Sequence, residues 1–214
     1  MPLSAPAARQ LLHKRVVQCW GYQREDGLWD IEGRMVDTKT YAFPNEDRGG
    51  QIQPGEPLHD MWIRLTVDPQ FRIHDIEACT DDSPFSLCPT ITSRYRLLIG
   101  ERIGPGWSVK LRELFSGLNG CTHMTELLGP VATTMFQTVY GKRYDEDESK
   151  AAQDRSPPPV LNTCHALASD SQVVKTRWPQ AYSGSEGEPP LKLSLIHISE
   201  PTRRTPISYA VFCL

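Results

Sequence analysis

Hydrophobic and polar residues alternate along two pairs of stretches in the first half of the chain, a pattern typical of half-buried β-strands. Residues 16–24 and 28–37 are rich in β-branched and aromatic side chains and are separated by an Asp-Gly turn. This pattern predicts a long antiparallel hairpin. Residues 61–67 and 71–79 repeat it around a turn at residues 68–70, which predicts a second hairpin.

Beyond the second hairpin the apolar residues recur every three or four positions, which indicates helices. The predicted helices cover residues 92–100, residues 108–115 and residues 121 to about 140, the last interrupted or restarted at Gly129-Pro130. Helices follow strands without the strict alternation of a parallel sheet. We therefore predict an α+β fold in which an antiparallel sheet from two hairpins packs against about three helices.

Composition separates an ordered core from less regular segments around it. The predicted segments are a disordered N-terminal arm (1–14), an α+β core domain (15–140) with a surface loop at 44–57, a charged linker that ends in prolines (141–159), a C-terminal segment that packs on the core (160–182), a flexible tail (183–192) and an artefact (193–214).

The last segment is interpreted as translated sequencing adaptor. Residues 193–203 translate one end of a sequencing-library adaptor and residues 207–214 translate its flow-cell end, in order and in frame. We therefore leave residues 193–214 out of the reasoning about the fold. Cys213 and His197 are not counted as candidate ligands for the same reason.

The overall composition narrows the classes of function. The chain has 214 residues, of which 39% are hydrophobic, and a formal net charge of −3. This charge favours neither nucleic acid nor an anionic membrane, and no run of 18 apolar residues predicts a spanning helix. The N-terminus lacks the basic start and apolar stretch of a signal peptide. We expect a cytoplasmic protein whose cysteines are thiols or ligands and whose partner is an unknown protein.

Cysteine, histidine and aspartate residues stand at the ends of several predicted elements. The set consists of His59, Asp60, Cys88, Cys121 and His123. Thiolate, imidazole and carboxylate groups together suit zinc or iron, so we predict a metal site formed by these five residues. Residues two apart in a helix point about 200° from each other, so Cys121 and His123 can share an ion only if residues 120–122 lie in the turn before the helix.

Two other interpretations remain open. The first is an enzyme in which Cys121 or Cys88 is the nucleophile and His59 or His123 is the base. The second is a non-catalytic binding or assembly module whose cysteines belong to the core, as buried cysteines commonly do.

Six short motifs occur in a defined order between about residue 13 and residue 182. They are GLWDIEG at 27–33, HDMW at 59–62, CP at 88–89, IGPGW at 103–107, GCTH at 120–123 and CHAL at 164–167. In these motifs the chain resembles a bacterial family known as domain of unknown function 2889. The resemblance implies membership of that family and implies no activity.

The order of elements and ligand-type residues also resembles the NifU/IscU-type iron–sulfur scaffold. Asp60 matches the scaffold's aspartate, His59 falls near its first cysteine and Cys88 matches its second cysteine. Cys121 and His123 match its final pair in reversed order, separated by one residue. The resemblance implies a NifU/IscU-like core whose ligands hold zinc, iron or an iron–sulfur cluster.

Overall fold

The computed structural model describes residues 3–146 and 160–184, which belong to two compact units. Unit 1 (Met1–Ser149) contains a sheet with its helices, and unit 2 (Lys150–Leu214) contains a short helical segment. The predicted artefact lies entirely outside the described residues. Most of the predicted linker also lies outside them, as does the predicted flexible tail after residue 184.

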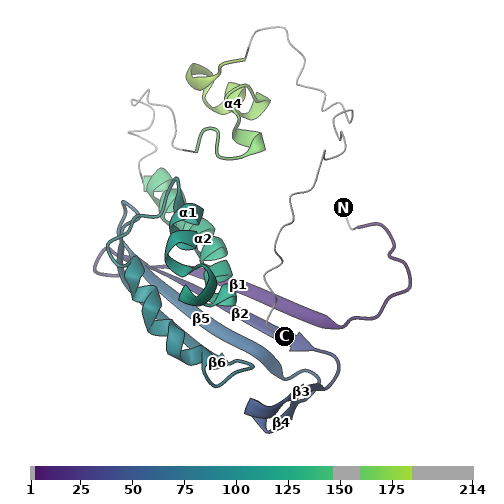
Figure 1. The fold of residues 1–214 in the computed structure, drawn as a ribbon. Coiled ribbons are helices and arrows are strands. Elements are labelled where there is room, and N and C mark those ends of the chain that lie inside the picture. The colour runs from purple at the N-terminus through teal and green to yellow at the C-terminus, as the bar shows by residue number, and fades with distance from the viewer. Residues whose placement is uncertain (1–2, 147–159, 185–214) are drawn as a thin grey trace, which may run out of the picture. The chain divides into compact units, whose positions relative to one another are not determined.

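A four-stranded antiparallel sheet is the centre of unit 1 (Figure 1). Its strands are β1 (His13–Gln23), β2 (Trp29–Lys39), β5 (Pro57–Val67) and β6 (Ile73–Asp82), in the order β1-β2-β5-β6. β1 pairs with β2, and β5 pairs with β6, so both predicted hairpins are confirmed. The α+β class is confirmed as well. β1 begins at His13, inside the segment predicted as a disordered arm.

The segment between the two hairpins is more ordered than the predicted surface loop. It contains β3 (Phe43–Asn45), the 3-10 turn η1 (Glu46–Arg48) and β4 (Gly50–Ile52), and β3 pairs with β4 as a separate small sheet. The Asn45 side chain explains part of this order, because its oxygen accepts a hydrogen bond of 2.9 Å from the Arg48 N–H.

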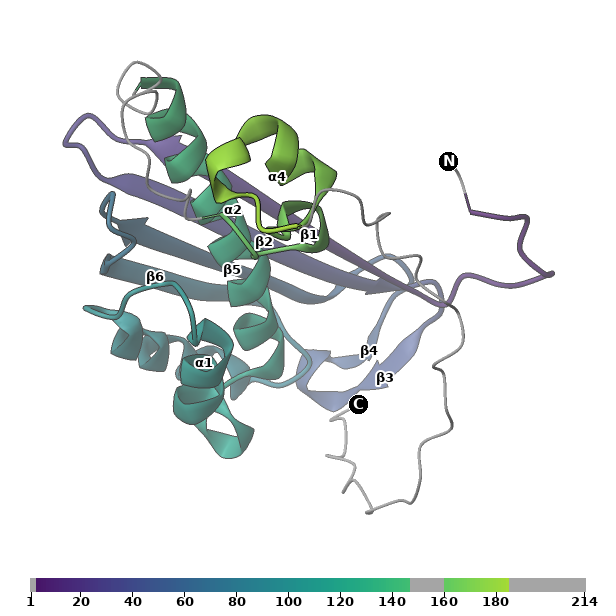
Figure 2. The same cartoon turned by 90° about the horizontal axis from the view of Figure 1, so that it is seen from above.

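The helical elements of unit 1 lie on one face of the sheet, as Figures 1 and 2 show. They are η2 (Cys88–Leu98), α1 (Trp107–Phe115), η3 (Gly117–Asn119) and α2 (Thr122–Glu146). The first predicted helix is a 3-10 element that begins earlier than expected, and α1 and α2 agree with the other two. Within the described ranges, no helix combines the length and apolar character needed to cross a membrane.

The long helix α2 is continuous, so the interruption predicted at Gly129-Pro130 was wrong. Pro130 lies inside the helix. Proline disfavours helical backbone in the preceding residue by contact with that residue's Cβ, and Gly129 has no Cβ. Burial of Leu128 and Val131 in the core also holds this part of the helix against the sheet. The helix then continues into the first residues of the predicted linker.

Two glycines allow α2 to approach the sheet closely. A Cβ at position 33 in β2 would lie 2.5 Å from Val131 Cγ2 and 3.2 Å from Leu127 Cδ1. A Cβ at position 21 in β1 would lie 2.1 Å from the hydroxyl oxygen of Thr138. The missing side chains therefore determine how near the helix comes to β1 and β2, and with it the position of the residues at the N-terminal end of α2.

We expect Gly33→Ala to lower the free energy of unfolding by about 1–2 kcal/mol, because the added methyl group must displace α2. Gly141→Ala is the control and makes the same change within α2, away from the sheet contact. Nothing lies within 4 Å of a Cβ at position 141, so the control is expected to be neutral or stabilising. Urea unfolding measures both changes. Equal stability of the two variants would contradict the close approach.

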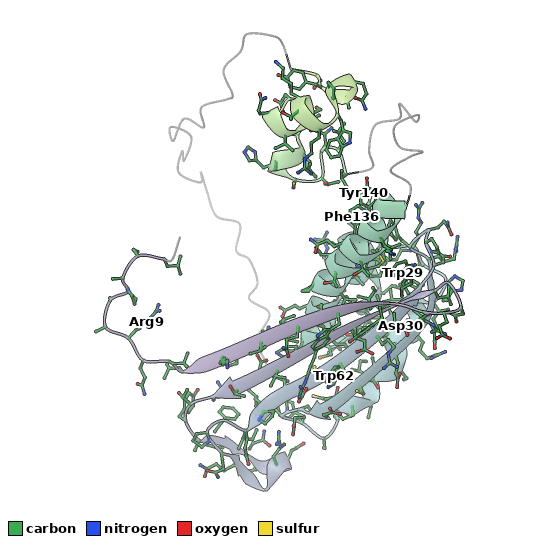
Figure 3. All side chains as sticks on the ribbon, turned by 180° about the vertical axis from the view of Figure 1, so that it is seen from behind. Arg9, Trp29, Asp30, Trp62, Phe136 and Tyr140 are labelled. Atoms are coloured by element: carbon green, nitrogen blue, oxygen red, sulfur yellow. The ribbon has the colours of Figure 1, made fainter. Side chains whose placement is uncertain are left out.

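The two faces of the sheet differ because successive side chains along a strand point to opposite sides. In β2, Trp29, Ile31 and Met35 are buried under the helices. On the opposite, open face, Trp62 stacks on Trp20 with ring centroids 5.9 Å apart. Figure 3 views this open face and labels Trp62 on it.

Unit 2 is built around a short helix. It contains η4 (His165–Leu167), α4 (Gln172–Arg177) and η5 (Pro179–Ala181). The Ser171 hydroxyl accepts a hydrogen bond from the Val174 N–H and begins α4, and Val174 is buried. The packing of this segment on the core domain stays a prediction.

Candidate metal centre

A row of polar side chains crosses three strands where the hydrophobic rows of the covered face end. Arg15 in β1 is the direct neighbour of Asp37 in β2, and Asp37 is the direct neighbour of His59 in β5. Each of these residues continues an alternating row, so Asp37 follows buried Met35 and His59 precedes buried Met61 on the same face. The centre therefore forms by β-sheet register, at one end of the hydrophobic core.

The N-terminal turn of α2 packs against this row on the covered face of the sheet. His123 places its ring 3.9 Å from the His59 ring, centroid to centroid, and its Nε2 lies 4.0 Å from Asp37 Oδ2. Glu126 follows one helical turn later and accepts a hydrogen bond of 2.8 Å from Arg15 Nη1. Strands and helix thus contribute jointly to one cluster.

Asp37 is the buried acceptor at the middle of the cluster. Its Oδ1 accepts from Arg15 Nε at 2.8 Å and from His13 Nε2 at 3.2 Å. Its Oδ2 accepts from Arg15 Nη2 at 2.8 Å and from His59 Nδ1 at 3.0 Å. Burial favours the protonated acid, but the hydrogen bonds from His59 and Arg15 outweigh it and hold the pKa of Asp37 well below its usual range. The carboxylate is therefore ionised at neutral pH.

His123 is held in the neutral form. Burial, together with the neighbouring His59 and Arg15, outweighs the opposite effect of Asp37 and lowers the pKa of His123 from 6.5 to about 4. A neutral imidazole has a free nitrogen lone pair at neutral pH, which is the form that binds metal ions.

Three of these residues are arranged as a set of metal ligands. One side-chain ligand atom from each of Asp37, His59 and His123 lies within 4.8 Å of the others. Among residues 3–146 and 160–184, these three form the group of His, Cys, Asp or Glu side chains that converge in this way. Two imidazoles and a carboxylate are a ligand set for zinc and for non-haem iron. The geometry can therefore hold one ion.

The structure brings together His59 and His123 of the five predicted ligands and adds Asp37, which the sequence reasoning missed. Asp60 lies on the opposite face of the sheet, because it follows His59 in the same strand. There its carboxylate accepts hydrogen bonds from Arg34 Nε at 2.9 Å and Nη2 at 2.5 Å. Asp37 had one signal in the sequence, since it continues the buried alternation of Ile31 and Met35.

The two predicted cysteine ligands lie outside the three-residue group. Cys121 immediately precedes α2, and its carbonyl accepts the first helical hydrogen bond, 2.9 Å from the Thr125 N–H. Burial raises the pKa of the Cys121 thiol and outweighs hydrogen bonds from the N–H groups of Met124 and His123; the charge of Cys88 raises it further. Cys121 therefore caps the helix that carries His123.

Tyr95 fixes this helix start from η2. Its hydroxyl donates to the Cys121 carbonyl at 2.9 Å, accepts from the Cys121 N–H at 3.0 Å and lies 2.9 Å from the Thr125 hydroxyl. Tyr95 is fully buried, and its ring stacks on Phe115. The core thus positions the turn that supplies His123.

We expect Tyr95→Phe to lower the free energy of unfolding by about 1 kcal/mol, because it removes a buried hydroxyl with several partners. Tyr22→Phe makes the same change on a side chain that is largely exposed, and is expected to be neutral. Thermal unfolding of the two variants measures the difference. A Tyr95 variant as stable as the Tyr22 variant would show that the hydroxyl does not hold the helix start.

The fold and the cluster together define an α+β protein with a candidate mononuclear metal centre. The chain belongs to the family described as Protein of unknown function (DUF2889), whose family model matches residues 13–137. The matched region contains β1 to β6 and the part of α2 that bears His123, so it contains the whole cluster. No curated protein and no solved structure matches the chain.

Proposed function

We propose that this protein binds one divalent transition-metal ion, zinc or ferrous iron, through Asp37, His59 and His123. The observation that carries the proposal is the convergence of three ligand atoms from two strands and a helix. A mononuclear ion held by three protein ligands keeps coordination positions open for a small molecule.

Two of the three distances between ligand atoms suit a shared ion. Two atoms that each lie about 2.1 Å from one ion can be no more than about 4.2 Å apart. Asp37 Oδ2 lies 3.0 Å from His59 Nδ1 and 4.0 Å from His123 Nε2, so both pairs satisfy this limit. The charge states of two ligands are suitable as well, because Asp37 is ionised and His123 is neutral at neutral pH. His59 Nδ1 donates to Oδ2 in the metal-free protein and releases that proton to solvent when it binds the ion.

Arg15 and His13 support the carboxylate from its other side. Arg15 donates to both oxygens of Asp37, and His13 donates to Oδ1. Hydrogen bonds of this kind fix the orientation of a ligating carboxylate and tune its affinity for the ion. Oδ2 is the oxygen that faces both histidines and is the one we assign to the metal.

A mononuclear ion is favoured over an iron–sulfur cluster. Clusters are held mainly by cysteine thiolates, and neither Cys88 nor Cys121 belongs to the three-residue group. The NifU/IscU-like core therefore stays a prediction about the fold. The raised pKa of Cys121 also gives no support to a thiolate nucleophile at neutral pH. A protein partner and a cytoplasmic location remain expectations from composition.

The test measures metal in the full-length protein after incubation with zinc or, anaerobically, with ferrous iron, followed by removal of the excess. We expect about one equivalent in the wild type and less than a tenth of an equivalent in Asp37→Asn and His123→Ala. Asp60→Asn and Cys121→Ser are the controls and are expected to keep the ion. Metal retained by His123→Ala, or lost from both controls, would refute the assignment.

A further inference from the structure

We propose that the metal centre receives an oxyanion, the carboxylate or phosphate group of a small molecule, at Arg15 Nη1 in the place that Glu126 occupies. This inference rests on the proposed function and adds the class of ligand to it. The supporting feature is that Arg15 binds two carboxylates, a buried one from Asp37 and an exposed one from Glu126.

The inner carboxylate is fixed and the outer one is exchangeable. Asp37 binds Arg15 through two parallel hydrogen bonds and its side chain is 1% exposed. Glu126 binds Arg15 through one hydrogen bond and its side chain is 55% exposed. An ion pair at such an exposure contributes little to stability, so an incoming anion can displace Glu126 at low cost.

The displaced position adjoins two of the proposed ligands, Asp37 and His123. Arg15 bridges Asp37 and Glu126, and Glu126 stands one helical turn after His123 on α2. A guanidinium group with a free edge presents N–H donors that match the paired oxygens of a carboxylate or phosphate. An anion bound to that edge would therefore lie next to Asp37, on the side of α2 that carries His123.

The formal charges favour an anion once the ion is bound. A divalent ion and Arg15 carry three positive charges against the two carboxylates of Asp37 and Glu126. One positive charge remains uncompensated, and the N-terminal end of α2 adds a partial positive charge at the same place. Without the ion the balance is negative, so metal and anion bind cooperatively.

The site is open on this side. The side chains of His13 and Arg15 are 41% and 35% exposed, whereas that of His59 is 10% exposed. The two most buried residues, Asp37 and His59, are thus proposed ligands, the third ligand His123 is 26% exposed, and the most accessible residues are donors. A small anion can reach Arg15 without movement of the sheet.

The experiment titrates the cobalt-loaded, full-length protein with inorganic phosphate and, separately, with acetate, and follows the visible absorption of the bound cobalt. We expect a saturable change in the wild type, at least tenfold tighter binding by Glu126→Gln and at least tenfold weaker binding by Arg15→Lys. The glutamine removes the competing carboxylate, whereas lysine keeps the charge without the planar fork. The anion with the higher affinity identifies the group as phosphate or carboxylate.

Arg64 provides a matched control on the open face, because it also lies between two carboxylates. Its Nε donates to Glu32 and its Nη1 donates to Glu77, whose side chain is 73% exposed. Glu77→Gln is expected to leave the anion affinity unchanged. Equal affinities in Glu126→Gln and the wild type, the same gain in Glu77→Gln, or no spectral change with cobalt bound would overturn the inference. Failure to bind cobalt, zinc or iron would instead refute the proposed function and the inference with it.

Discussion

The Asp37→Asn protein is expected to lose about 3–5 kcal/mol of its free energy of unfolding in metal-free buffer, because the change removes the charge of a buried acceptor that holds several donors. Arg15, His13 and His59 all donate to this carboxylate, whose side chain is 1% exposed. Asparagine keeps the shape but carries no charge, and only one of its two terminal atoms accepts hydrogen bonds. Urea unfolding in the presence of a chelator measures the loss.

Asp75→Asn is the matched control for this prediction. Asp75 Oδ1 lies 3.2 Å from Arg96 Nη1, and both side chains are 60% exposed. Removal of this exposed pair is expected to change the free energy of unfolding by less than about 1 kcal/mol. Similar losses at positions 37 and 75 would mean that the buried carboxylate does not stabilise the end of the sheet.

The strands and hairpins could be predicted because their information is local. A period of two and a turn of Asp-Gly type determine which residues pair, and β1 and β2 pair in the expected hairpin. The continuity of α2 could not be read in the same way. Its local signal at Gly129-Pro130 favours a break, and packing of Leu128 and Val131 against the sheet overrides that signal.

The candidate centre was only partly predictable, since it depends on faces and register rather than on proximity in the chain. Because His59 and Asp60 are neighbours in sequence, the sequence reasoning placed both in one site. In the strand they lie on opposite faces of the sheet. Asp37 is 22 positions from His59 and pairs with it directly across β2 and β5. A lone acidic residue at the end of a strand usually indicates a solvated turn, and only the covering helix makes this one buried.

The cysteine prediction illustrates the same limit. The sequence reasoning required residues 120–122 to lie in the turn before the helix if Cys121 was to share an ion with His123; Cys121 does precede α2, but Thr122 is its first residue. The condition is met only for residues 120 and 121, and the thiol lies outside the three-residue group, because it turns back to the first N–H groups of the helix. The residue type allowed two roles, and the backbone donors beside it select the structural one in the metal-free protein.

The metal-free protein is expected to lose roughly 2–3 kcal/mol of stability as the pH falls from about 7 to about 4, through protonation of His123. The pKa of His123 is about 4 in the folded protein against 6.5 for an ordinary histidine, because the ring is buried beside His59 and Arg15. Between these values the unfolded chain binds a proton that the folded protein does not, so each step down in pH favours unfolding. Asp37 and His13 also face the ring. The pKa of Asp37 is also lowered in the folded protein. The stability that this carboxylate contributes is lost only below its ordinary pKa of 3.8, outside the range from pH 7 to pH 4.

His123→Gln isolates the effect, because glutamine fills similar space and does not titrate. Urea unfolding of both proteins at several values of pH, with a chelator present, is expected to give a flatter stability profile for the variant between about pH 6.5 and pH 4. The two profiles converge towards the acid end, where the wild type has lost the contribution of its neutral ring. Parallel profiles would mean that His123 is not held neutral, and would remove one of the two charge states on which the metal proposal depends.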